Sequence, residues 1–217
     1  MTPNYKNAII ESIKTLQTYG INSIPIDLDI IIKNLYRTVR VCSYSKFSKK
    51  FGKSISEICV YFDSELGACA YNKTREHYII YYNDTKNNPG LKRFTIAHEL
   101  GHILLKHHHD ASTELLLRKN ISQLKYKRYE NEANCFARNL LCPVPLVSTD
   151  IPINDIMKAF DISYSAAKTR LNFYEIDNYR MTAEFYTYFE SYTIPFKNKY
   201  TDNNININFS SNKLVNL

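Results

Sequence analysis

The feature that most constrains this chain is a mostly apolar run, Phe94 to Leu105, that carries two histidines four positions apart. On a helix, residues i and i+4 lie one turn apart on the same face. The imidazoles of His98 and His102 can therefore reach one metal ion, and zinc binds imidazole nitrogen at about 2.0–2.1 Å. Glu99 points about a quarter turn away, where it is better placed to accept a proton from a water on the metal than to bind the metal itself.

The alternative is a surface helix with two solvated histidines. Against it, apolar side chains cover most of the circumference of this helix and predict that it is buried: Ile96, Ala97, Leu100, Ile103, Leu104 and Leu105. Buried histidines are costly unless a partner satisfies them. The pattern therefore favours a metal site over a solvated surface.

A second helical segment runs from Glu130 to Leu141 and supplies further polar candidates. One stripe at helical spacing contains Glu130, Ala133, Asn134, Ala137 and Leu141. Its two alanines would let this helix approach the first one closely. Glu130 could then supply a third ligand, and Asn134 a hydrogen bond that orients a ligating side chain. The alternative is an ordinary amphipathic helix with solvated glutamates at 130 and 132, which the nearby histidine pair makes less favourable.

Together the two segments resemble the ImmA/IrrE family of zinc metallopeptidases. The resemblance spans roughly residues 21–172, is densest from 77 to 143, and rests on four pieces: Arg93-Phe94-Thr95-Ile96-Ala97, His98-Glu99-x-x-His102, Glu130-x-Glu132-Ala133-Asn134-x-Phe136-Ala137, and Leu140-Leu141-x-Pro143. Cys142 departs from the family, which often has Met there. The resemblance implies that His98, His102 and Glu130 are zinc ligands and that Glu99 is the catalytic base. The choice of Glu130 over Glu132 follows the Glu-x-x-Ala-Asn pattern of related zinc peptidases.

The same resemblance implies an α+β, zincin-like fold in which a small antiparallel sheet packs on the two metal-bearing helices. Family members are bacterial cytosolic endopeptidases that cleave a helix-turn-helix repressor of a mobile element, a prophage or a stress regulon. We therefore expect a cytoplasmic Zn²⁺ endopeptidase whose partner is such a repressor. The sequence does not indicate the oligomeric state.

Two strand-like runs, residues 67–71 and 77–83, have the spacing of a hairpin, and residues 38–42 predict another strand. In zinc peptidases of this type, an edge strand near the metal helix binds the substrate backbone by strand addition. By resemblance, Tyr78, Ile80 and Tyr82 are the candidate substrate-binding residues. The alternative is an inner strand that is already paired on both sides.

The remaining elements are expected to complete one domain. Helices are predicted over residues 4–19, 28–36, 153–160 and 163–172, while residues 55–62 fit a helix or a strand. We expect a single peptidase domain over residues 1–175, closed by the helix pair at 153–172, and a partly disordered extension over residues 176–217.

Charge and composition limit the other readings. The net charge of +7 fits a solvated, lysine-rich surface better than a nucleic-acid site, so direct binding to DNA is not expected even though residues 153–172 have the outline of a helix-turn-helix. The apolar runs are too short to span a bilayer, and the start lacks the pattern of a signal peptide. Five cysteines without a Cys-x-x-Cys pair indicate reduced thiols in a cytosolic protein.

Two other functions remain open from the sequence. One is a DNA-binding or scaffold regulator with a non-catalytic zinc, although Glu99 would have no role there and closed structural sites favour Cys. The other is a broad peptidase without a dedicated partner. Candidates to stabilise the oxyanion of the reaction are one residue of an expected exposed histidine run and two tyrosines: His107, His108, His109, Tyr126 and Tyr129.

Overall fold

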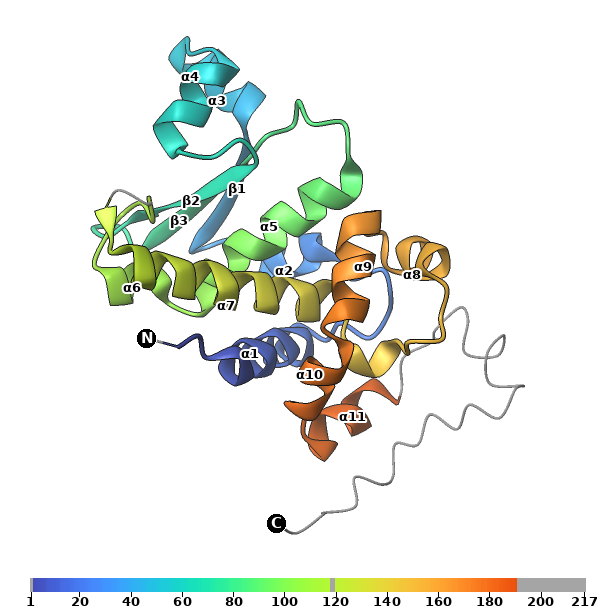
Figure 1. The fold of residues 1–217 in the computed structure, drawn as a ribbon. Helices are drawn as coiled ribbons and strands as arrows, with labels where there is room; N and C mark the ends of the chain where they lie inside the picture. Colours follow the sequence, from blue (N-terminus) through green and yellow to red (C-terminus); the bar gives the residue numbers. More distant parts are fainter. Residues whose placement is uncertain (1, 118–119, 191–217) are drawn as a thin grey trace.

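A computed structural model describes residues 2–117 and 120–190 of the chain (Figure 1). The first half contains α1 (Tyr5–Thr18), α2 (Leu28–Asn34), β1 (Val39–Ser43), α3 (Tyr44–Phe51), α4 (Ile55–Phe62), β2 (Gly67–Asn72), β3 (His77–Tyr82) and α5 (Pro89–Leu104). The second half contains α6 (His107–Ala111), α7 (Gln123–Leu141), the 3-10 turn η2 (Val144–Leu146), α8 (Ile153–Phe160), α9 (Tyr164–Asn172), α10 (Tyr174–Tyr179) and α11 (Ala183–Phe189).

The three strands form one small sheet in the order β1-β3-β2. β2 and β3 make the expected antiparallel hairpin, whereas β1 runs parallel to β3. The α+β class is therefore confirmed, but the expectation of an all-antiparallel sheet is wrong. The reason is the long crossover through α3, α4 and β2, which lets β1 and β3 run in the same direction. Alternation in sequence identifies a strand and leaves its direction open.

The order of the strands also corrects the expected substrate-binding strand. β3 lies between β1 and β2, so Tyr78 pairs with Val39 on one side and with Tyr71 on the other. Ile80 and Tyr82 are paired on both sides in the same way. A strand with two neighbours has no backbone groups left for a third, so Tyr78, Ile80 and Tyr82 cannot bind a peptide by strand addition. The inner-strand alternative is the one that the fold adopts.

Local capping chemistry decides where the helices around the sheet begin. Asn88 caps α5 by accepting the Leu91 N–H at 3.0 Å, and Pro89 occupies the first turn, where a missing N–H costs nothing. Ser54 and Glu57 form a reciprocal capping box at the start of α4. This box resolves the ambiguous stretch at residues 55–62 as a helix.

α5 and α7 run side by side beneath the sheet and form the centre of the molecule (Figure 1). Gly101 makes the close approach possible, because a Cβ at this position would lie 3.1 Å from Cδ1 of Phe136 and 3.2 Å from Cα of Ala133. Ala133 and Ala137 are fully buried. Ala133, one of the two alanines predicted on the α7 stripe, therefore faces α5, and α1 also packs against α7.

The C-terminal helices pack onto the domain beyond the expected boundary at residue 175. That boundary falls inside α10, and Asp177 on the same helix is fully buried against Arg138 of α7 and Arg170 of α9. Phe189 of α11 is also buried. The packed part of the expected extension therefore reaches α11, and residues 191–217 lie outside the described residues. Over residues 2–117 and 120–190, no helix has the length and apolarity required to cross a bilayer.

Candidate metal centre

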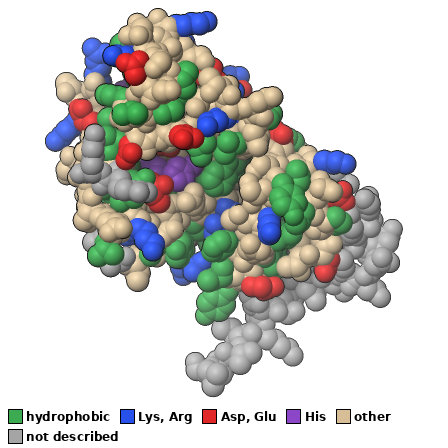
Figure 2. Space-filling view, turned by 45° about the horizontal axis from the view of Figure 1, so that its top comes forward, with side chains coloured by type: hydrophobic (Ala, Val, Ile, Leu, Met, Phe, Trp, Pro, Cys, Tyr) green, Lys and Arg blue, Asp and Glu red, His purple; other side chains and the backbone are tan. Residues whose placement is uncertain are grey.

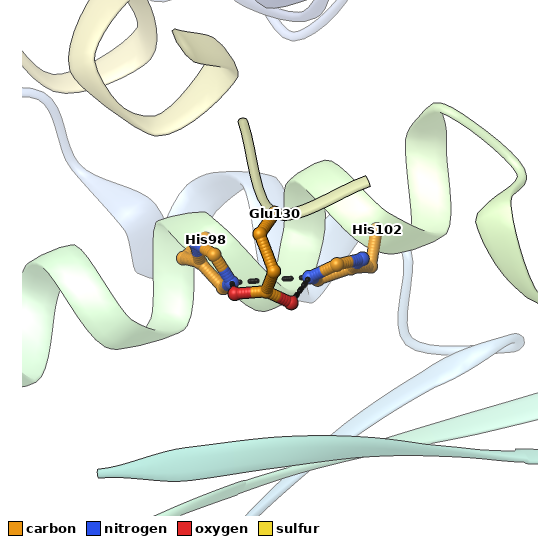
Figure 3. A group of neighbouring side chains, drawn as sticks. All are labelled: His98, His102 and Glu130. Atoms are coloured by element: carbon orange, nitrogen blue, oxygen red, sulfur yellow. Dashed lines mark hydrogen bonds and ion pairs between the residues drawn. The ribbon is translucent and has the colours of Figure 1, made fainter. Parts of the chain in front are cut away.

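Three side chains from α5 and α7 point toward one another (Figure 3). His98 and His102 lie one turn apart on α5, and their Nε2 atoms are 3.0 Å from each other. Glu130 of α7 reaches across with Oε2 at 3.5 Å from Nε2 of His98 and Oε1 at 3.3 Å from Nε2 of His102. All candidate ligand atoms lie within 4.8 Å of one another. The sequence predicted this convergence.

The donor set fits a tetrahedral divalent cation. Zinc–nitrogen bonds of about 2.0–2.1 Å place two nitrogens of one tetrahedron about 3.3 Å apart. The observed separation of 3.0 Å between the two Nε2 atoms is close to this value. Two imidazoles and one carboxylate leave a fourth position open, which is the arrangement of catalytic rather than structural sites.

Asn134 occupies the position that the sequence predicted for an orienting residue. Its Oδ1 lies 3.0 Å from Nδ1 of His98. An amide oxygen can only accept, so Nδ1 of His98 carries the proton and Nε2 keeps its lone pair facing Glu130 and His102. This tautomer is the one that a metal ligand requires.

Electrostatics in the cluster favour a positive charge between the three side chains. Burial alone would raise the pKa of Glu130, but its contacts with His102 and His98 outweigh burial and lower it. Burial would likewise lower the pKa of His98, and its hydrogen bond with Glu130 reverses the sign and raises it. The pKa of His102 is lowered, first by burial and then by the charge of His98. The Glu130 carboxylate therefore stabilises positive charge at Nε2 of His98, the atom from which a metal ion would displace the proton.

Glu99 lies in the wall of the cavity next to the cluster. Its side chain is buried, and burial is the main cause that raises the pKa of Glu99 to about 7. The charge of His98 opposes this rise and the charge of Glu130 adds to it. A carboxyl group with such a pKa can both accept and release a proton near neutral pH.

The cluster opens into a cavity of about 240 Å³. Figure 2 shows histidine side chains recessed in a hollow of the surface. Helices α5 and α7 line one side of the cavity, and Gly67, Ala68 and Cys69 of β2 and residues 115–117 also line it. The metal candidates are therefore reachable from outside through this hollow.

Sequence reasoning missed two residues beside the cluster. The sequence predicted an exposed histidine run that includes His107 and assigned no role to Glu132, and both side chains are buried. Nδ1 of His107 lies 2.9 Å from Nδ1 of His102, and its Nε2 lies 2.9 Å from Oε2 of Glu132. A histidine run after a helix carries no periodicity that would reveal this contact. One sequence signal was available: glutamates at positions 130 and 132 lie on opposite sides of a helix, so one of them must face a different neighbour from the metal site.

The candidates for oxyanion stabilisation divide by position. Tyr126 and His108 line the cavity, so either could reach a bound peptide. Tyr129 is fully buried, stacks on His107 and donates its hydroxyl hydrogen to Asp110, which places it behind the cluster. His109 is exposed and is hydrogen-bonded to the Tyr78 hydroxyl at 2.8 Å.

Comparison with known protein families identifies the region that carries the cluster. The family model Peptidase_M78, described as the IrrE N-terminal-like domain, matches residues 60–172. This range contains His98, Glu99, His102 and Glu130 as well as the β2–β3 hairpin. No curated protein sequence matches the chain significantly.

Proposed function

The chain belongs to the Peptidase_M78 (IrrE N-terminal-like) family of metallopeptidases, and we propose that it is a cytoplasmic, zinc-dependent endopeptidase that cleaves one specific protein, a helix-turn-helix transcriptional repressor. The observation that carries this proposal is the convergence of His98, His102 and Glu130 at the base of a cavity whose wall contains Glu99. Neither a closed structural site nor a scaffold would need that carboxyl group.

Each residue of the cluster has a separate role in the proposed reaction. His98, His102 and Glu130 would hold a zinc ion, which would supply Lewis acidity to a bound water and to the scissile carbonyl group. Glu99 accepts the proton of the attacking water and passes it to the leaving nitrogen. Asn134 holds His98 in the ring orientation and tautomer that ligation requires. Tyr126 and His108 are the cavity residues available to stabilise the oxyanion.

We assign substrate binding to the outer edge of β2 in place of Tyr78, Ile80 and Tyr82. The N–H of Tyr71 points away from β3 and donates to the Glu114 carbonyl oxygen at 2.8 Å. Backbone groups alternate along a strand, so those of Cys69 point to the same outer side. Ala70 already forms an antiparallel bridge with Leu115 on that side, so a peptide would pair with the edge that precedes Ala70. The segment Gly67–Cys69 also lines the metal cavity. An extended peptide paired with this part of β2 would therefore run past the cluster.

The small volume of the cavity, about 240 Å³, supports a dedicated substrate rather than general proteolysis. A peptide must enter as an extended strand, so a folded protein is cut only where it offers an accessible loop. The family resemblance points to a repressor as the protein that offers this loop. A small helix-turn-helix protein encoded beside this chain would be the first substrate to test.

The test compares the wild-type chain with Glu99→Gln, incubated with that neighbouring repressor and, separately, with casein. We expect the wild type to cut the repressor at one site and to leave casein intact. Glu99→Gln should keep the fold and bound zinc but cleave about 10²- to 10⁴-fold more slowly, because it cannot accept the proton. Glu65→Gln, a change at an exposed glutamate paired with Lys86, is the control and should cleave normally. Undiminished cleavage by Glu99→Gln would refute the mechanism.

The structure gives no support to the alternative of a DNA-binding regulator. In the helix pair α8–α9, Arg170 is fully buried and paired with Asp177, so it is not available to phosphates. Ile156 and Phe160 turn the inner face of α8 into the core. A gel-shift assay with random duplex DNA at moderate salt should show no complex, and a stable complex would favour the regulator.

A further inference from the structure

A series of hydrogen-bonded, buried side chains lies directly behind the metal cluster: His102, His107 and Glu132. His102 contacts His107 of α6 through their Nδ1 atoms at 2.9 Å, and His107 contacts Glu132 of α7 at 2.9 Å. Lys106, in the left-handed conformation with φ of 59°, makes the turn that brings α6 back against α5. The contact between His102 and His107 therefore depends on the sharp reversal of the chain after α5.

Neighbouring residues hold both His107 and Glu132 of this hydrogen-bonded series in place. The ring of His107 stacks on Tyr129 with centroids 4.3 Å apart. Oε1 of Glu132 accepts the backbone N–H of Asn4 at 2.7 Å and lies 3.4 Å from Nε of Arg128. Glu132 is thus surrounded by donors, so it acts as an acceptor toward His107.

Because Glu132 is an acceptor, it sets the direction of both hydrogen bonds in the series, from His107 to Glu132 and from His102 to His107. Nε2–H of His107 donates to Glu132, which leaves Nδ1 of His107 without a hydrogen. Nδ1 of His107 can then only accept, so Nδ1–H of His102 donates to it. His102 is left with a bare Nε2, and this is the atom that faces His98 and Glu130. The reverse direction would place a hydrogen on that Nε2 and block ligation.

We propose that His107 and Glu132 are positioning residues that hold His102 in its metal-binding tautomer and ring orientation. They do for His102 what Asn134 does for His98, but through two side chains in series. The inference rests on the proposed zinc site. It adds that affinity for the ion depends on two residues that do not touch it.

The experiment measures zinc affinity by competition with a chromogenic chelator and records the visible spectrum of the Co²⁺-substituted full chain. His107→Phe keeps the ring that stacks on Tyr129 and removes both nitrogens. We expect it to bind zinc about 10- to 100-fold more weakly and to shift the Co²⁺ bands. His107→Gln carries an acceptor and a donor at similar spacing and should restore affinity to within a few-fold of wild type.

Glu132→Gln tests the direction of these hydrogen bonds and leaves the volume of the side chain almost unchanged. Its amide oxygen would take the side that faces Asn4 N–H and Arg128, so its NH₂ group would face His107 and reverse the hydrogen bonds. Zinc affinity should fall at least as far as in His107→Phe. His109→Phe, in the same helix but exposed and in contact with the Tyr78 hydroxyl, is the matched control and should bind zinc like the wild type.

The outcomes separate this inference from the function it rests on. If the wild-type chain fails to bind zinc, the proposed peptidase itself is wrong. If the wild type binds zinc and both His107→Phe and Glu132→Gln bind it equally well with unchanged Co²⁺ spectra, only the positioning role is overturned. Circular dichroism of each variant checks the fold, and if His107→Phe does not fold, Glu132→Gln alone decides between these results.

Discussion

At the scale of single residues, the candidate centre divides its donors unequally between two helices. His98 and His102 come from one turn of α5 and would keep their relative position in any helix. Glu130 reaches the site only because α7 lies against α5. The carboxylate is thus the donor that depends on the tertiary fold, and its replacement tests whether the fold builds the site.

Glu130→Ala should remove the third ligand and its negative charge while leaving both imidazoles in place. We expect zinc affinity to fall by more than the roughly 10- to 100-fold that is lost when a residue supporting a ligand is replaced. Cleavage should be lost as well. Equilibrium dialysis with zinc measures the first effect. Glu65→Ala, which removes an exposed carboxylate, is the control and should bind zinc normally. Equal zinc binding by wild type and Glu130→Ala would contradict the assignment.

Residue spacing predicted part of the cluster and missed the rest for a definite reason. His98, His102, Glu130 and Asn134 follow helical periodicity, so their shared faces could be read from the sequence. His107 and Glu132 come together through a turn at Lys106 and through the approach of two helices. No local pattern encodes such a contact, which is why the sequence placed His107 in an exposed run and gave Glu132 no role.

At the scale of elements, the site depends on how closely α5 and α7 pack. Gly101 sits on α5 between the two ligand-bearing turns and faces Ala133, one turn beyond Glu130 on α7. A side chain larger than hydrogen at position 101 meets Ala133 and Phe136 at little more than 3 Å. The spacing of the two helices, and with it the reach of Glu130, is therefore set at this contact.

Gly101→Val should force the helices apart, lower the free energy of unfolding by about 1–3 kcal/mol and weaken zinc binding at the same time. Urea unfolding followed by circular dichroism gives the first quantity, since the chain has no Trp, and chelator competition gives the second. Lys92→Val places the same branched residue on an exposed position of α5 and controls for helix propensity. If Gly101→Val binds zinc as tightly as Lys92→Val does, the spacing of the helices does not limit the site.

A second element-scale contact fastens α10 to the domain. Asp177 pairs with Arg138 at 2.8 Å and with Arg170 at 2.7 Å, and it is fully buried. Burial raises the pKa of Asp177, but the charges of Arg138 and Arg170 outweigh burial and lower it. Since the folded pKa lies below the unfolded one, this carboxylate stabilises the fold above the unfolded value of about 3.9 and stops doing so as the pH falls through the folded value.

Asp177→Asn should therefore lower the free energy of unfolding by about 3–5 kcal/mol at neutral pH, because it leaves two buried guanidinium groups without their anion. The difference between wild type and variant should begin to shrink as the pH falls below about 4, where the unfolded wild-type chain takes up a proton at Asp177, and should vanish as the pH passes through the lower pKa of the folded state. Urea unfolding at several pH values measures this difference. Glu175→Gln, at an exposed position of the same helix, should cost little. A pH-independent difference would show that charge is not the cause.

At the scale of the whole molecule, the sequence predicted the class of fold, the hairpin and the helices α1, α2, α8 and α9 close to their observed bounds, and it identified α5 and α7, although α7 begins at Gln123 and not at Glu130. It did not predict that β1 runs parallel to β3 or that β3 is central, because pairing partners are chosen by long-range packing. Nothing in the local composition reveals that Asp177, within the extension expected after residue 175, pairs with Arg138 and Arg170. The errors thus concern contacts between distant segments.

The central claim is that two helices beneath a small sheet bring three side chains to one divalent cation. The most direct measurement is anomalous diffraction at the zinc absorption edge from crystals of the full chain grown with zinc. We predict one dominant peak within bonding distance of Nε2 of His98, Nε2 of His102 and a carboxylate oxygen of Glu130. A dominant peak at His107–His109 or elsewhere, with none between these three side chains, would contradict the account.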